Sequence, residues 1–270
     1  GSTGSGALTI RNGGAYRVGS GALTLGDQAG SSGLVTVNGG GSSLTATGWY
    51  SYVGRSGEGT LIIDGGASLE NDTTWIGWAA GSEGHVTVSG PGSTWTGIQT
   101  QATTFPAIYV GNAGTGTLTV ENGGSILNMS AVHVGREAGG NGTVTVTGAN
   151  SYLRSGEFYI GGGNSSLTGT GALLISNGGE VDSFTSFVGR RGTGSASVSG
   201  AGSSWDINGT LFVGEANSGS LDISDGGVVN ATTVILGRSS GGSGTALVQG
   251  AESQLTITGD LFVGAQSEGS

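Results

Sequence analysis

Apolar and polar residues alternate with a period of two over short segments along the whole chain. Val86-Thr87-Val88 and Val144-Thr145-Val146 are typical segments, and glycines separate each one from the next. This alternation is the pattern of strands with one buried face, and no stretch has the period of an amphipathic helix. The sequence therefore predicts a protein made of strands and turns.

One unit recurs ten times, and its clearest copy begins GTLTVENGGSI at Gly116. A glycine opens the first strand of every copy: Gly6, Gly33, Gly59, Gly84, Gly116, Gly142, Gly171, Gly194, Gly219 and Gly244. Another closes the last strand: Gly26, Gly54, Gly77, Gly111, Gly135, Gly161, Gly189, Gly214, Gly237 and Gly264. The residue two places after the first strand is always Gly, Asn or Asp: Asn12, Gly39, Gly65, Gly90, Asn122, Gly148, Asn177, Gly200, Asp225 and Gly250. These three residue types tolerate a left-handed backbone, so this position predicts a tight turn.

The spacing of these positions predicts the architecture. Successive turn residues lie 23 to 32 residues apart, with a mean of about 26. A unit of this size, holding about three short strands, cannot bury a face alone and must stack on its neighbours. We therefore expect a parallel β-solenoid of about ten coils, a single unit over residues 1–270, with coils about 4.8 Å apart. Insertions near residues 97–106 and 161–170 should form loops.

Odd and even copies differ. Odd copies read like Ile175-Ser176-Asn177-Gly178-Gly179, whereas even copies read like the segment VSGAGSSW that begins at Val198. The elementary duplication is therefore a pair of copies, about 52 residues long.

The alternation also assigns a core. Its expected members are the inward residues of the first strands, such as Leu118 and Val120 or Leu221 and Ile223. The residues before the closing glycines belong to it too: Leu25, Val53, Ile76, Val110, Val134, Ile160, Val188, Val213, Leu236 and Val263. Trp95 and Trp205, with Leu44, Leu153 and Leu255 at the matching positions, are expected to fill the even coils.

Composition narrows the classes of function. The chain has 61 Gly but only 2 Pro and no Cys, and the regular period of the glycines argues against a flexible linker. The net charge is −10 and all eight basic residues are Arg, a poor match for nucleic acid or anionic lipid. No apolar run is long enough to insert into a membrane. We expect no cofactor and no metal.

The most distinctive column lies two places before the closing glycine, and we call it the aromatic stripe. Its members are Thr24, Tyr52, Trp75, Tyr109, His133, Tyr159, Phe187, Phe212, Ile235 and Phe262. Since inward aliphatic residues flank it, it should point outward. One interpretation is a stack of rings that stabilises the sheet; the other is an exposed surface for a glycan or a second rod, formed by Tyr52, Trp75, Tyr109, Tyr159, Phe187, Phe212 and Phe262.

A second column follows the closing glycine and contains what we call the charged edge: Arg55, Arg136, Arg190, Glu215 and Arg238. Arg190, Glu215 and Arg238 place opposite charges on successive coils and predict a surface ion-pair ladder, whose pairs are each worth less than about 1 kcal/mol. The alternative is an Arg-lined edge that captures acidic sugars.

Little in the sequence points to catalysis. Glycan-cleaving enzymes need paired carboxylates, whereas the acids here are scattered over turns. His85 and His133 are expected to be solvated strand residues. A column of Thr9, Thr36, Thr87, Thr119 and Thr145 raises the alternative of an ice-binding surface, but only two coils have the Thr-x-Thr pair it needs.

The alternation of GTLTVxNGG with VTVSGxGSxW, joined by LxVG, resembles the repeats in passenger domains of bacterial type V autotransporter adhesins of the AIDA-like group. The resemblance runs from Gly6 to Gly264 and implies a right-handed parallel β-helix on the outside of the bacterial outer membrane. It also implies a role in adhesion, aggregation or biofilm formation, with this chain as a segment of a longer passenger. The expected partners are a host-surface glycan or protein, or a second copy of the chain. The alternative is a carbohydrate-binding or polysaccharide-cleaving β-helix.

Overall fold

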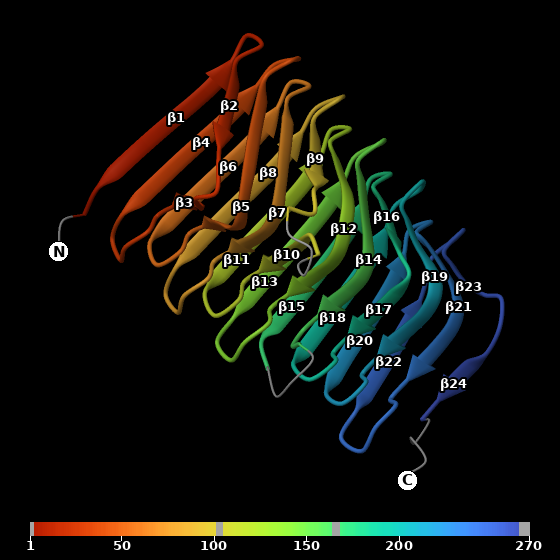
Figure 1. Cartoon of the computed structure of the whole chain (residues 1–270). Coiled ribbons are helices and arrows are strands. Elements are labelled where there is room, and N and C mark those ends of the chain that lie inside the picture. Colours follow the sequence, from red (N-terminus) through yellow and green to blue (C-terminus); the bar gives the residue numbers. More distant parts are fainter. Residues whose placement is uncertain (1–2, 101–104, 164–167, 265–270) are drawn as a thin grey trace.

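The computed structural model describes residues 3–100, 105–163 and 168–264, and over this range the chain is an all-β solenoid of about ten coils. Figure 1 shows the strands stacked side by side from the N-terminus to the C-terminus. No helix occurs among the described residues, so none of them forms a helix long and apolar enough to cross a membrane. The predicted fold class is confirmed. Parts of the two expected insertions, residues 101–104 and 164–167, lie outside the described residues.

The first strands of the coils form one parallel sheet of ten strands. In spatial order they are β1 (Ser5–Arg11), β4 (Ser32–Asn38), β6 (Glu58–Asp64), β8 (Glu83–Ser89), β11 (Thr115–Glu121), β13 (Asn141–Thr147), β15 (Thr170–Ser176), β18 (Thr193–Ser199), β20 (Ser218–Ser224) and β22 (Ser243–Val248). Every opening glycine is the Cα partner of the next one, from Gly6 with Gly33 to Gly219 with Gly244. The glycine column therefore identifies the register of the whole sheet.

The rest of each coil forms a second parallel sheet of 14 strands. They are β2 (Ala15–Val18), β3 (Leu23–Leu25), β5 (Ser43–Val53), β7 (Ser68–Ile76), β9 (Thr94–Gly97), β10 (Ala107–Val110), β12 (Ser125–Val134), β14 (Tyr152–Ile160), β16 (Glu180–Ser183), β17 (Thr185–Val188), β19 (Ser204–Val213), β21 (Val228–Leu236), β23 (Gln254–Ile257) and β24 (Leu261–Val263). In six coils one long strand replaces the two strands expected after the turn. Each coil thus contributes strands to two sheets, and the second sheet bends midway along its strands.

Each even coil has a glycine near this bend, where register shifts also interrupt three of the strand pairings. These glycines are Gly48, Gly97, Gly156, Gly209 and Gly259. A Cβ atom on Gly48 would lie 2.1 Å from the carbonyl oxygen of Gly21, and one on Gly209 would lie 2.5 Å from that of Phe184. Because such contacts are shorter than any tolerated carbon–oxygen approach, the adjacent coil can pass this point only over glycine.

All ten predicted turn residues have a left-handed backbone, including the non-glycines Asn12, Asn122, Asn177 and Asp225 with φ between 53° and 57°. A hydrogen bond at these turns explains why odd and even coils differ. A serine of each even coil accepts a hydrogen bond from a backbone N–H in the turn of an adjacent odd coil, as Ser151 Oγ does from Gly123 at 3.0 Å. The other pairs are Ser42 with Gly13, Ser93 with Gly66, Ser203 with Gly178 and Ser253 with Gly226.

The core lies between the two sheets and contains nearly every residue assigned to it from the sequence. Trp95 and Trp205 are fully buried, as are most of the residues that precede the closing glycines. Leu236 and Leu255 are only partly buried, and Val263 is 74% exposed, so its assignment to the core is wrong. Val263 lies in the last described coil, where no following coil covers it in the structure.

Candidate functional site

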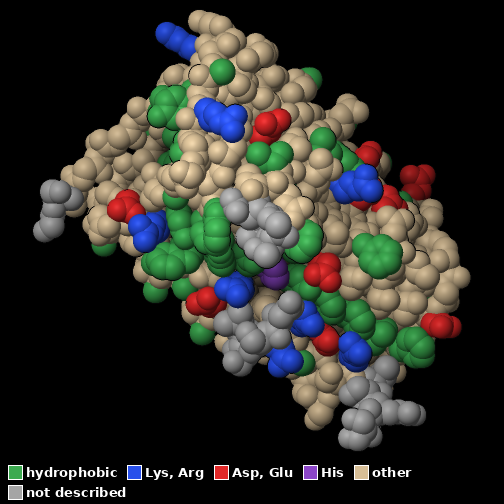
Figure 2. Space-filling model, in the orientation of Figure 1, with side chains coloured by type: hydrophobic (Ala, Val, Ile, Leu, Met, Phe, Trp, Pro, Cys, Tyr) green, Lys and Arg blue, Asp and Glu red, His purple; other side chains and the backbone are tan. Residues whose placement is uncertain are grey.

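The aromatic stripe runs along the second sheet as a single ladder. Its ten members are consecutive Cα partners, from Thr24 with Tyr52 to Ile235 with Phe262. Figure 2 shows this face of the molecule, with a band of hydrophobic side chains along the rod and basic side chains beside it. The side chains lie outside the core, as the alternation predicts.

Six neighbouring rings of the stripe form a continuous parallel stack: Trp75, Tyr109, His133, Tyr159, Phe187 and Phe212. Their centroids are 3.8 to 5.0 Å apart and their planes agree within 9°. This spacing matches the separation of paired strands, about 4.8 Å, so the coil repeat itself brings the rings face to face. The interpretation of the stripe as a ring stack is confirmed for these six members.

The stack leaves the inner rings without a free face. Tyr109, His133, Tyr159 and Phe187 each have a ring on both sides, and the last three are less than 9% exposed. A sugar packs on an aromatic side chain through the ring face, which here is occupied. This part of the stripe therefore offers a ligand only ring edges, while Phe262, at 44% exposed, lies beyond the stack.

The charged edge lies against the stripe and covers it. The guanidinium carbon of Arg136 is 5.3 Å from the ring centroid of Tyr109, that of Arg190 is 4.4 Å from Phe187, and that of Arg238 is 4.9 Å from Phe212. Arg55 lies 5.4 Å from the ring of Tyr52. Each such contact stabilises the surface by about 0.5–1 kcal/mol at exposed sites.

Arg190, Glu215 and Arg238 form the ion pairs expected from their spacing, and the other two arginines of the charged edge form pairs that were not predicted. Glu215 bridges two coils, because its Oε2 is 3.0 Å from Arg190 Nε and its Oε1 is 3.1 Å from Arg238 Nη1. Arg55 pairs with Asp27 at 2.7 Å and Arg136 with Glu137 at 3.1 Å. Every arginine of the charged edge thus contacts both a ring and a carboxylate, so an acidic sugar would have to compete with a carboxylate already in place. Capture of acidic sugars stays a prediction.

The expectation that His133 is solvated is wrong. Its ring is 8% exposed between Tyr109 and Tyr159, and Nδ1 has no hydrogen-bond partner among the described residues. Burial, with smaller contributions from the nearby charges of Arg136 and Arg190, lowers the pKa of His133 to about 3. The imidazole is therefore neutral at physiological pH and acts as one more flat ring in the stack. His85 is half-buried, with Nδ1 2.8 Å from Thr117 Oγ1.

The stripe changes character at its N-terminal end. Tyr52 does not stack on Trp75; instead the ring of Tyr50 is tilted by 53° to that of Tyr52 and meets Trp75 edge-on at 60°, and Trp78 meets Tyr52 edge-on at 77°. Sequence reasoning did not assign Tyr50 or Trp78 to a site. The available signal was their position: Tyr50 lies two residues before Tyr52, on the same face of the strand, and Trp78 follows Gly77 in the column of the charged edge.

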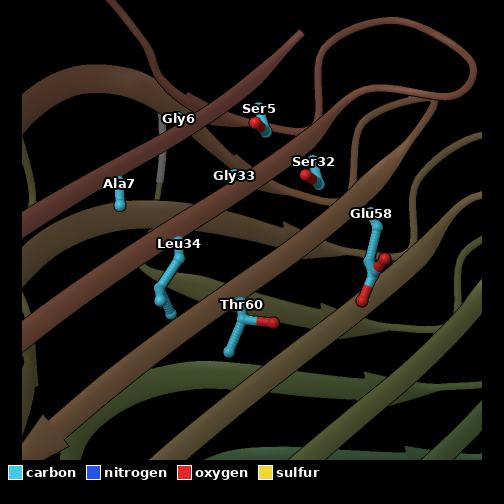
Figure 3. A pocket seen from close by; sticks show the side chains of 8 residues that line it. All are labelled: Ser5, Gly6, Ala7, Ser32, Gly33, Leu34, Glu58 and Thr60. Carbon is cyan, nitrogen blue, oxygen red and sulfur yellow. The ribbon is translucent and has the colours of Figure 1, made fainter. Parts of the chain in front are cut away.

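Outside the stripe, two pairs of acids are Cα partners on adjacent strands: Asp182 with Asp206, and Glu58 with Glu83. No three His, Cys, Asp or Glu residues in the described part of the chain come together so that they could hold a metal ion. A depression of about 580 Å³ lies over β1, β4 and β6, and Figure 3 shows that Ser5, Ser32, Thr60 and Leu34 line it with Glu58 as the one acid.

Sequence comparisons relate the chain to three curated proteins. It is 32% identical over 183 residues to the uncharacterized lipoprotein YdeK of Escherichia coli (strain K12). This alignment covers 64% of this chain and 13% of that protein. It is 27% identical over 201 residues to the uncharacterized protein YuaQ of the same strain, covering 68% of this chain and 14% of the relative. No family model and no solved structure matches. The chain is also 33% identical over 111 residues to the adhesin BmaC autotransporter of Brucella suis biovar 1 (strain 1330). This alignment covers 38% of this chain and 3% of that protein.

Proposed function

We propose that this chain is a non-catalytic segment of a bacterial cell-surface autotransporter adhesin. In this role it is a stiff section of the passenger that holds the molecule away from the cell and takes part in adhesion or self-association. The partial identity to the adhesin BmaC autotransporter supports the class, and the solenoid of about ten coils supports the role as a rod. The chain spans 13% and 14% of the two E. coli relatives, so the activity of the whole protein is part of the proposal.

The ring stack is the observation that carries the rigid role. A solenoid is held together only by contacts between neighbouring coils, so its stiffness depends on how continuous those contacts are. Here six stacked rings extend across six successive coils, and Arg190, Glu215 and Arg238 add ion pairs along the same line. Stacked aromatic pairs contribute about 0.5–1.5 kcal/mol each beyond their burial.

Cell display tests the proposal. The chain would be presented on the surface of a non-aggregating bacterial strain, and settling of the culture and attachment to host cells would be measured against the same strain with an empty display scaffold. We expect increased settling or attachment from cells that carry the chain. Hydrolysis or lyase activity of the purified chain on a polysaccharide panel would contradict the non-catalytic assignment. If display changes neither settling nor attachment, the proposed part in adhesion or self-association is wrong. Only the role of a rigid stalk is then left.

A further inference from the structure

We propose that the N-terminal end of the aromatic stripe is a binding site for a neutral hexopyranose oligosaccharide. The site is formed by Tyr50, Tyr52, Trp75 and Trp78, which we call the aromatic platform, with Arg55 at its border. It rests on the proposed function in that it names a ligand class for the adhesin surface, but the purified chain tests it without any cell.

The rings of the platform are arranged differently from those of the stack. Beyond Trp75 the ring contacts change from parallel to tilted or edge-on, with centroids 5.8 to 6.4 Å apart and interplanar angles of 53° to 77°. The stripe member before Tyr52 is Thr24, which has no ring to cover it. Tyr50 is 39% exposed, and Tyr52, Trp75 and Trp78 are half-buried. Arg55 lies over the rings of Tyr52 and Trp78, and Arg136 lies over that of Trp75, so the ring surface here is open only in part, most of all at Tyr50.

The polar atoms of the platform support the same ligand. The two buried indoles have partners: Trp95 Nε1 donates to Asn71 Oδ1 at 2.8 Å and Trp205 Nε1 to Ser183 Oγ at 3.1 Å. In contrast, the indoles of Trp75 and Trp78 and the phenols of Tyr50 and Tyr52 have no hydrogen-bond partner among the described residues. The platform thus combines apolar ring surface with four unused polar groups at its edges.

A hexopyranose has the complementary chemistry, because its C–H groups form apolar faces and its hydroxyl groups lie around the rim. The site favours a neutral sugar, since the charge of Arg55 is already paired with Asp27 at 2.7 Å. A specific protein partner is less suited, because such interfaces cover about 800 Å² per side with roughly 20–30 residues. Four side chains supply only a fraction of that surface.

Indole NMR signals test the site directly, because the chain has five Trp residues. The ¹⁵N-labelled chain would be titrated with cellotetraose, maltotetraose and chitotetraose as separate probes. We expect the indole N–H signals of Trp75 and Trp78 to shift with at least one probe, while those of the buried Trp95 and Trp205 stay unchanged. Trp49, 51% exposed and without a ring contact to the platform among the described residues, reports on non-specific association.

Two variants and a control complete the test. Tyr50→Ala and Trp78→Ala should each weaken binding by about tenfold or more. Phe184→Ala removes a more exposed ring, 63% accessible, from a distant coil and should leave the affinity unchanged. Unchanged Trp75 and Trp78 signals with all three sugars would overturn the site, as would equal loss of binding in the Phe184 variant. Shifts that depend on protein concentration alone would assign the platform to a second copy of the chain instead.

Failure of this site and failure of the proposed function are distinguishable. Cells that settle or attach while the purified chain binds no sugar would disprove the platform and leave the adhesin role standing. The opposite result is that the purified chain binds a sugar while its display changes neither settling nor attachment. That result would disprove the adhesin role and leave the platform standing.

Discussion

At the scale of single residues, small polar side chains at the turns contribute as much to the repeat as the glycines do. Ser151 is fully buried, and its Oγ is the acceptor for the N–H of Gly123 in an adjacent coil. A buried N–H without an acceptor costs about 1–3 kcal/mol. The serine of the even coils is therefore needed by the turn of the odd coils, which explains why the two kinds of coil alternate.

Replacement of this serine should destabilise the solenoid. We expect Ser151→Ala to lower the free energy of unfolding by about 0.5–1.5 kcal/mol, because the half-buried Gly123 N–H loses its acceptor. Chemical denaturation with circular dichroism detection measures the change. Ser240→Ala is the control, since Ser240 is exposed and its side chain has no hydrogen bond to a described residue. Equal stability of the two variants would refute the role of Ser151.

His133 makes the stability of the stack depend on pH. The pKa is about 3 in the fold against an ordinary value of 6.5, so below pH 6.5 the unfolded chain binds a proton that the folded chain excludes. The stabilising contribution is therefore complete above pH 6.5 and is lost as the pH falls toward 3. The loss at pH 4 should be on the order of 3 kcal/mol.

The variant His133→Phe isolates this effect, since it keeps a ring in the stack and removes the titrating group. Urea denaturation at pH 7, 5 and 4 should show a smaller loss of stability in the variant than in the original chain. The carboxylates and the arginines near the site, Arg136 and Arg190, are common to both proteins and cancel in the comparison. Parallel pH profiles for the two proteins would show that folding does not lower the pKa of His133.

At the scale of strands and sheets, the sequence was sufficient for the architecture. The opening glycines identified every register of the first sheet, and the turn column identified ten left-handed residues, because both depend on local backbone constraints. The bend in the second sheet was not predicted. Gly156 and its counterparts are required by a carbonyl group of another coil, a contact between residues that lie far apart in the chain.

The same reasoning explains which part of the candidate site was predicted. The alternation placed the aromatic stripe outside the core, but the covering of its rings depends on where the long side chain of Arg190 or Arg136 folds back. A period of two gives only the side of the sheet on which a side chain lies. Burial of His133 and the open arrangement around Tyr50 follow from three-dimensional packing that the period does not contain.

Removal of a stacked ring tests whether the aromatic stack stabilises the solenoid, when compared with removal of an exposed ring from the same column. Phe187→Ala deletes a ring that is 7% exposed, stacked on both faces and covered by Arg190, and should lower the free energy of unfolding by about 3–5 kcal/mol. Phe262→Ala, in the same column but 44% exposed, should cost less than about 1 kcal/mol. Thermal and chemical denaturation of both variants provide the comparison. Similar small losses would mean that the stack contributes little.

At the scale of the whole molecule, stability is distributed along one dimension. Each coil contacts its two neighbours, so a local defect is felt most in the adjacent coils and fades along the rod. This differs from a globular domain with one central core, in which a core substitution loosens all strands together. The six-ring stack and the ion pairs of Glu215 are the contacts that extend this coupling over several coils.

Hydrogen exchange in the Phe187→Ala variant tests this view. Strands β14 and β19 pair with β17, which carries residue 187, and their amides should exchange faster than in the original chain. The amides of β4 and β6 lie several coils away and should exchange at unchanged rates, because their hydrogen bonds and core contacts involve none of the coils near the cavity. Mass spectrometry of peptic fragments resolves the two regions in one experiment. An equal increase in both would show that the solenoid opens as a single cooperative unit, and the stiffness inferred for the rod would then belong to the whole chain rather than to the contacts between neighbouring coils.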